Sequence, residues 1–423
     1  MYKRLQHITV SQKKLWILAL MGIFFTLALS LTLNRVPFIR HKSDFFLRWH
    51  ATVKLIEERR NLYDARNGED ISEIVYGGNL DYETNFYYPA FLIIFTAPLS
   101  LVSYPIAHII WTTAVQLFYL IGIWLIIQEV GWPQKVNHIT VLMLVCVLFV
   151  PYFQHTIWGQ FNTIGMLSLA MCWITLRRSK YGLAGALSTG MLIKPHSSVL
   201  VLVFLFIWVV AKKTRWYFLV GFSVTSFVLW LVPELIQPGW VFDFIKSLGG
   251  YVPTKSVLDQ WWNPNQVLAV TLTLGAIFLF LRLRNTSIAS PQFAACLGIS
   301  LYVWALIVPI IGVFHILMFP ITMIMLLSHL QHIYPRLYKV ALSCFGAIYV
   351  LGWIGFIAGL PNADLYGMHI IWSEMAHKSA LPVISILFSL PLLVSTNENQ
   401  LEKVLRASNF RFKSKLEDGY QND

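Results

Sequence analysis

The stretch LWILALMGIFFTLALSLTL, at residues 15–33, decides the fold class because it contains no charged side chain and has nearly the length of a membrane span. A helix needs about 20 predominantly apolar residues to cross the hydrocarbon core of a bilayer. A second run, SSVLVLVFLFIWVVA at residues 197–211, has the same character, and further runs follow with short charged or aromatic breaks between them. Because helices satisfy their own backbone hydrogen bonds in lipid, the sequence predicts an all-α polytopic membrane protein.

The composition of the whole chain agrees with this fold class. Of its 423 residues, 57% are hydrophobic and 12% are charged, whereas an average soluble domain has about 25% charged residues. A transmembrane β-barrel would show segments of roughly ten residues with alternating hydrophobicity, and the sequence contains no such pattern. The net charge of +12 is spread over separate clusters, so it does not indicate a nucleic-acid partner.

The reactive side chains indicate neither a cofactor nor a metal. All four cysteines lie within apolar runs and form no CxxC pair, which argues against a zinc site and against a disulfide framework. The sequence contains no DxD nucleotide-sugar motif, no Walker loop and no set of residues with metal-ligand spacing. We therefore expect a protein that works without a cofactor or a bound metal.

The distribution of Lys and Arg predicts the orientation of the chain. Cytoplasmic loops concentrate these residues, and basic clusters recur at 177–180, 212–215, 282–284, 336–339 and 403–415. Placing all of them inside predicts a multi-pass protein of the inner (plasma) membrane, with about twelve spans and both termini cytoplasmic. The expected spans are 15–33, 104–128, 138–151, 162–177, 181–194, 197–211, 216–233, 265–281, 292–310, 314–330, 337–360 and 379–395.

This topology divides the chain into a transmembrane domain, residues 1–395, and a basic cytoplasmic tail, residues 396–423. The apolar segment from Tyr88 to Val102 would reverse the alternation if it crossed the membrane, and it contains two prolines. We therefore expect it to form a re-entrant or interfacial helix on the outer side. The spans 138–151 and 181–194 are short for a bilayer, which suggests helices that end early around a cavity.

The first outer loop, residues 34–103, is the largest and contains nine of the twenty acidic residues. Apolar side chains recur in it at helical spacing, at Phe45, Trp49, Val53 and Ile56. This spacing predicts an amphipathic helix on the membrane surface. Asp44 stands at the start of that helix, and two interpretations stay open. Its carboxylate could stabilise the helix start through the dipole, or it could carry chemistry at the outer face.

Several segments together resemble glycosyltransferase family 87, the polyprenyl-phosphate-mannose-dependent enzymes of the GT-C architecture. The resemblance runs from about Asp44 to Pro320, and its specificity comes from the order and spacing of the segments. They are SDFF (43–46), LYDARNG (62–68), NFYYPAFLIIFTAPLSLVSYPIAHIIW (85–111), WGQFNTIGMLSLAMCWITLRR (158–178), GLAGALSTGMLIKP (182–195), WWNPNQVL (261–268) and VPIIGVFHILMFPI (308–321). The implied fold is a GT-C-type bundle whose large first outer loop carries amphipathic helices.

The resemblance implies roles for three residues. In such enzymes the first outer loop supplies the acidic catalytic residue, which maps onto Asp44. Lys194 ends a short span where other GT-C enzymes place a Lys against the lipid phosphate, although a Lys there could also snorkel to the interface. His315 matches the family's outer-face His and would contact the donor phosphate or sugar, the alternative being a packed interfacial residue. The family's Ser and Trp before this His are replaced here by Ile310, Ile311 and Gly312.

Four further polar residues at expected helix starts could hydrogen-bond sugar hydroxyls, or could equally be helix caps. They are Gln160, Asn162, Asn265 and Gln266. With Lys194 and His315, they complete the expected set of donor-binding residues.

The expected activity is transfer of a hexose, mannose by resemblance, from a polyprenyl-phosphate-sugar donor to a glycolipid or glycan acceptor at the outer face. In a one-step inverting displacement, a carboxylate takes the proton of the acceptor hydroxyl. Two alternatives come from other classes. The first is a lipid-linked sugar transporter or flippase. Inverted repeats and charged residues deep in the spans would indicate transport, and the sequence shows neither. A surface-polysaccharide ligase would have its large loop late in the chain, whereas here the large loop comes first and is acidic.

Overall fold

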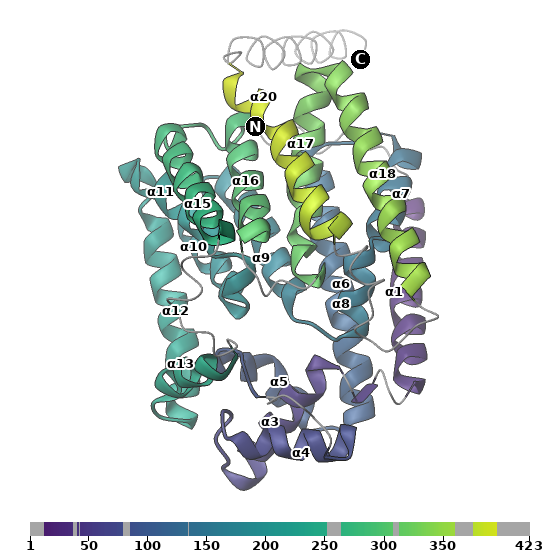
Figure 1. Ribbon diagram of the computed structural model, residues 1–423, viewed down its shortest axis with the longest axis vertical. Helices are drawn as coiled ribbons and strands as arrows, with labels where there is room; N and C mark the ends of the chain where they lie inside the picture. Colours follow the sequence, from purple (N-terminus) through teal and green to yellow (C-terminus); the bar gives the residue numbers. More distant parts are fainter. Residues whose placement is uncertain are drawn as a thin grey trace, which may run out of the picture.

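The computed structural model is a bundle of helices with a smaller helical layer at one end (Figure 1). It describes residues 12–36, 40–41, 43–78, 85–133, 135–251, 264–307, 313–359 and 375–395. All regular elements in these ranges are helices, which confirms the predicted all-α class. The predicted tail, residues 396–423, lies outside the described residues.

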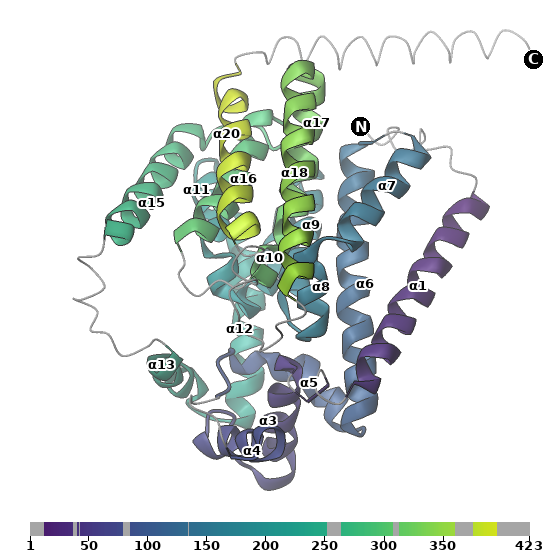
Figure 2. The same ribbon diagram turned by 45° about the vertical axis from the view of Figure 1, so that its right-hand side comes forward.

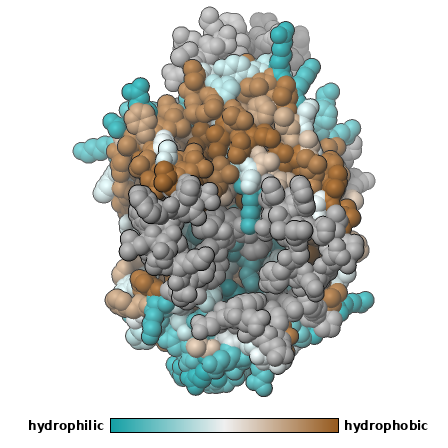
Figure 3. Space-filling model, viewed as in Figure 1, coloured by the Kyte–Doolittle hydropathy of each residue, from teal (hydrophilic) through white to brown (hydrophobic). Residues whose placement is uncertain are grey.

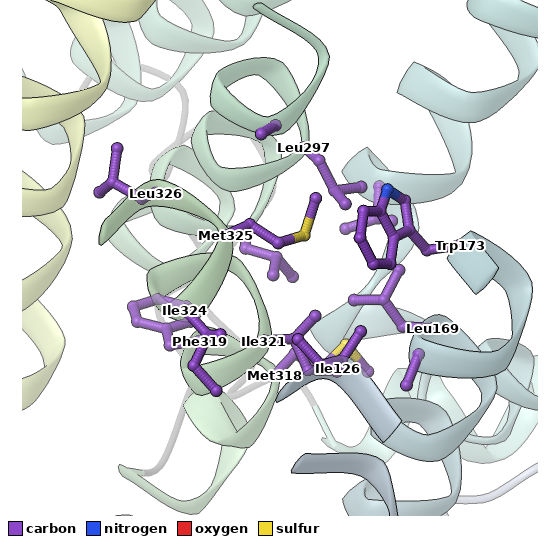
Figure 4. Close-up of a cluster of buried hydrophobic side chains, with 14 of the residues drawn as sticks. Ile126, Leu169, Trp173, Leu297, Met318, Phe319, Ile321, Ile324, Met325 and Leu326 are labelled. Atoms are coloured by element: carbon purple, nitrogen blue, oxygen red, sulfur yellow. The ribbon is translucent and has the colours of Figure 1, made fainter. Parts of the chain in front are cut away.

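The bundle contains the apolar helices of the chain, both long and short. They are α1 (Gln12–Arg35), α6 (Tyr104–Val130), α7 (Val136–Val147), α8 (Val150–Ile157), α9 (Asn162–Arg177), α10 (Tyr181–Ser188), α11 (Val199–Val210), α12 (Tyr217–Ile236), α15 (Pro264–Leu283), α16 (Pro291–Ile307), α17 (Phe319–Ile333), α18 (Pro335–Gly359) and α20 (Leu381–Val394). Figure 4 shows the centre of their core, where Met325 and Trp173 meet side chains such as Leu297 and Leu169. Apolar side chains also cover much of the outside, and Figure 3 shows them in brown across the upper part of the face in view. This surface indicates a lipid environment.

Among the described residues, five helices are long and apolar enough to cross a membrane, or six if the bent pair α7–α8 counts as one span. The apolar helices Tyr181–Ile193, Val199–Val210, Val267–Leu283 and Pro291–Ile307 are shorter. The structure therefore supports a multi-pass membrane protein, while the predicted twelve spans stay a prediction. Both segments that the sequence marked as short are irregular: α7 and α8 are bent by 50°, and α10 continues into a 3-10 helix, Thr189–Ile193, before Lys194.

A layer of shorter helices, here called the helical cap, lies at the lower end of the bundle (Figures 1 and 2). It comprises α3 (Asp44–Glu58), α4 (Ala65–Tyr76), the 3-10 helix Ala90–Leu92, α5 (Ile93–Ser100) and α13 (Trp240–Tyr251). Its apolar core is rich in aromatic side chains and is shared with the bundle, since it includes Trp111 of α6 and Ile164 of α9. The Trp49 indole donates to the carbonyl of Leu99 (2.9 Å), and the Thr52 and Thr96 hydroxyls are 2.8 Å apart. These bonds join α3 to α5.

The predicted amphipathic helix exists as α3, but much of its apolar surface packs within the protein. Phe45 is completely buried and Trp49 is half-buried, whereas Ile56 is 48% exposed. Helix α3 begins where the sequence suggested, because the Ser43 hydroxyl accepts a hydrogen bond from the Phe45 amide (3.1 Å) as an N-cap. Asp44 is therefore the first residue of the helix, held at the junction between cap and bundle.

Candidate functional site

Asp44 is held in place by the turn that precedes α9. Its backbone N–H donates to the carbonyl of Trp158 (2.9 Å). Gly159, which follows Trp158 in the chain, has a φ of +58°. A Cβ atom at this position would lie only 2.6 Å from the Ser43 hydroxyl oxygen. The Trp111 indole donates to the Gly159 carbonyl (2.9 Å) and fixes the turn from the other side. Glycine therefore lets this turn approach the start of α3 and brings Gln160 to Asp44.

Gln160 links the predicted catalytic acid, Asp44, with the predicted phosphate-binding residue, Lys194. Its amide nitrogen donates to Asp44 Oδ2, and its amide oxygen accepts from Lys194 Nζ. The same oxygen accepts from the Tyr88 hydroxyl (3.1 Å). Gln160 is 1% exposed. The structure thus brings Asp44, Gln160 and Lys194 into one hydrogen-bonded group, although they come from three separate parts of the chain.

A second cation, Arg48, belongs to the same group, although the sequence did not lead us to predict it. It lies one helical turn after Asp44 on α3, where its guanidinium donates to the Asp44 carbonyl (3.0 Å) and lies 3.8 Å from Asp44 Oδ1. The signal was present in the sequence, because residues four apart share one face of a helix. Arg48 is buried, with 7% of its surface exposed.

Tyr88, which the sequence also did not single out, contacts both cations. The Arg48 guanidinium carbon is 4.7 Å from the centre of its ring, and Lys194 Nζ is 5.4 Å from it. The face of an aromatic ring attracts cations at such distances. Tyr88 occurs in the motif NFYYP, but nothing in that motif distinguishes it from the neighbouring Tyr87.

Among the described residues, this group combines two buried cations with one carboxylate. Arg48 and Lys194 supply the cations, and Asp44 supplies the carboxylate. Two neighbouring cations in a desolvated site are suited to an anionic ligand. The Asp44 side chain is 34% exposed, so the carboxylate is accessible.

His315 lies in a neighbouring pair of histidines. Its Nε2 atom is 3.0 Å from Nε2 of His196, so one ring donates and the other accepts. The Trp304 indole donates to the His196 carbonyl (2.7 Å). Since His196 follows Lys194 by two residues, the pair adjoins the group around Asp44. His315 is 6% exposed.

The other predicted sugar-binding residues are less well placed by the structure. Asn162 is the first residue of α9 and is 1% exposed. Asn265 and Gln266 belong to the first turn of α15, but their side chains lie outside the described residues. Within the ranges that the structure describes, no three His, Cys, Asp or Glu side chains are grouped so as to hold a metal ion.

The family model described as glycosyltransferase family 87 matches residues 86–328 of the chain. This range confirms the family resemblance predicted from the sequence and includes Tyr88, Gln160, Lys194 and His315, whereas Asp44 and Arg48 precede it. No curated protein and no solved structure matches the chain.

Proposed function

The chain belongs to glycosyltransferase family 87, and on this premise we propose that it transfers a hexose, mannose by family resemblance, from a polyprenyl-phosphate carrier to a lipid or glycan acceptor. The observation that carries the proposal is the pair of buried cations, Arg48 and Lys194, beside the accessible carboxylate of Asp44. A phosphate-linked donor needs a cationic site, and the acceptor hydroxyl needs a base. Both requirements are met within one hydrogen-bonded group.

In the proposed reaction, the acceptor hydroxyl attacks the anomeric carbon of the donor sugar as the bond from that carbon to the phosphate oxygen breaks. The hydroxyl proton passes to the carboxylate of Asp44. The electron pair of the broken bond leaves with the polyprenyl phosphate. Attack from the face opposite the leaving group inverts the anomeric configuration.

Lys194 and Arg48 assist the departure of the phosphate. Negative charge grows on the leaving oxygen as the glycosidic bond stretches, and preorganised cations in a desolvated site stabilise such charge. Contact with the Tyr88 ring helps to keep both cations in place. In this scheme His315, supported by His196, contacts the phosphate or the sugar from the next segment of the bundle.

We place the reaction at the outer face of a plasma (inner) membrane that the chain crosses about twelve times. The site lies at the start of α6, where Phe45 stacks on Trp111 with ring centres 5.3 Å apart. The other end of α6 carries Glu129, which pairs with the predicted cytoplasmic cations Arg177 (3.4 Å) and Arg178 (3.1 Å). Trp111 and Glu129 both lie on α6, and the helix between them rises about 27 Å. The site and the basic cluster therefore lie at opposite ends of a membrane-length helix, as the proposed topology requires.

The test is transfer of radiolabelled sugar from polyprenyl-phosphate mannose, or the corresponding glucose donor, to an extracted lipid fraction by the purified wild-type protein. Asp44→Asn should lower kcat by about a hundredfold or more, because it removes the proton acceptor. Glu73→Gln, an exposed acid on α4 of the same cap, is the matched control and should keep full activity. Full transfer by Asp44→Asn would remove Asp44 from the mechanism. Absence of wild-type transfer from every polyprenyl-phosphate sugar would refute the proposed function.

A further inference from the structure

The bonding of Gln160 has only one possible direction. Side-chain amides donate through nitrogen and accept through oxygen. A carboxylate can only accept and an ammonium group can only donate, so exchanging the two ends of the amide would bring like partners together at both Asp44 and Lys194. The Tyr88 hydroxyl, 3.1 Å from the amide oxygen, is satisfied by the same orientation. Gln160 is thus a directional bridge from the base to the cation.

The bridge also keeps the two charged groups apart. In a direct ion pair, Lys194 would neutralise the carboxylate and hold the oxygen that must take the proton. With the amide between them, the bond from Gln160 is made to Oδ2 of Asp44, while Oδ1 stays 3.8 Å from the nearest Arg48 nitrogen. One carboxylate oxygen is thereby oriented and the other is left for chemistry.

The position of Gln160 is itself determined by its surroundings. Its backbone N–H donates to the carbonyl of His155 (3.1 Å), and the Gly159 turn before it is held by the Trp111 indole. The side chain is almost completely buried. Such support is what a catalytic geometry needs, since a displacement of about 1 Å can cost a hundredfold in rate.

We propose that Gln160, expected from the sequence to bind sugar, is instead a positioning residue that orients the Asp44 carboxylate and ties its orientation to the phosphate-binding Lys194. The inference rests on the proposed transferase activity. It means that the base is aligned through the same amide that contacts the donor-side cation. A donor phosphate that moves Lys194 therefore also acts on the carboxylate that receives the acceptor proton.

The test compares Gln160→Met and Gln160→Glu with the wild type. Methionine has a similar shape and cannot make the bridge, so kcat should fall by about tenfold to a hundredfold while the KM for the donor changes less than threefold. Gln154→Met, on the half-buried part of α8, is the matched control with the same chemical change and should behave as wild type. A raised donor KM with an unchanged kcat would show direct sugar binding and overturn the proposal.

Gln160→Glu provides a readout that a packing role would not affect. A second carboxylate beside Asp44 makes it harder to ionise both groups. The acid side of the kcat–pH profile should therefore move to higher pH by about one unit or more, and an unshifted profile would contradict the inference. Melting temperatures measured in detergent will establish whether each variant is folded. If both variants are fully active while Asp44→Asn is inactive, the positioning role fails and the transferase proposal stands.

Discussion

Lys194 shows at the residue scale how one side chain acquires its properties from its surroundings. In the sequence it is a lysine at the end of a short apolar segment, where snorkelling to the interface is a reasonable expectation. In the structure it is 7% exposed, bonded to Gln160 and placed over the Tyr88 ring. A buried position of this kind supports the phosphate-binding role over the snorkelling role.

Lys194→Ala should weaken donor binding, because it removes a buried cation proposed to contact the phosphate. The dissociation constant of a polyprenyl-phosphate sugar, measured by calorimetry in detergent, should rise by about tenfold or more.

Lys194→Arg is the control, because it keeps a positive charge at this position. Its donor affinity should stay closer to that of the wild type than the affinity of Lys194→Ala. An unchanged donor affinity in Lys194→Ala would mean that Lys194 does not bind the phosphate.

At the scale of the elements, α10 and α12 are packed backbone to backbone. A Cβ atom at Gly185 would lie 1.9 Å from the carbonyl oxygen of Phe218, and one at Gly221 would lie 1.9 Å from that of Gly182. Small residues allow membrane helices to approach this closely. The contact positions the end of α10, from which the chain continues to Lys194.

Gly221→Ala should therefore destabilise the protein, because the clash is with backbone that cannot rotate away. Inserting a methyl group into a packed contact costs about 1–3 kcal/mol, so the melting temperature in detergent should fall by several degrees. Gly275→Ala is the matched control in helix α15, where no atom lies within 4 Å of the added Cβ. Equal melting temperatures for the two variants would show that α10 and α12 do not pack in this way.

At the scale of the whole molecule, the cap and the bundle are joined by polar contacts as well as by the site. The Gln237 amide, directly after α12, donates to Asn61 (2.9 Å) and accepts from the backbone of Leu62 (3.0 Å). Within the cap, the Asn61 amide donates to Asp243 of α13 (2.6 Å). The Gln237 bonds connect the turn between α3 and α4 with the end of α12, so the cap that carries Asp44 is joined to the bundle that carries Lys194.

The proposed topology can be tested with a membrane-impermeant maleimide. Arg66→Cys, in the cap, replaces a side chain that is 64% exposed, and we expect labelling in intact spheroplasts. Arg178→Cys replaces one that is 48% exposed at the other end of the bundle, and labelling should require permeabilisation. Cys344→Ser serves as the background because the other three cysteines are buried. Labelling of position 178 in intact spheroplasts would mean that the protein has the opposite orientation in the membrane.

Local features of the sequence determined the helical membrane class and the start of α3. Apolar runs and the spacing of apolar side chains act within a few residues, so their consequences can be predicted without knowledge of the fold. The same holds for the irregular end of α10, which the shortness of its apolar segment indicated. The roles of Asp44 and Lys194 came from the family resemblance and stay proposals.

Only the tertiary structure decided which side chains surround Asp44. Gln160 had been one of several polar residues near helix starts, and Arg48 and Tyr88 had not been singled out at all. The bonds from Gln160 to Asp44 and Lys194 join residues 116 and 34 positions apart. Such contacts depend on the packing of several helices, and on the room that Gly159 leaves beside Ser43. The sequence supplies the chemical groups, but their distances are set by how the helices pack.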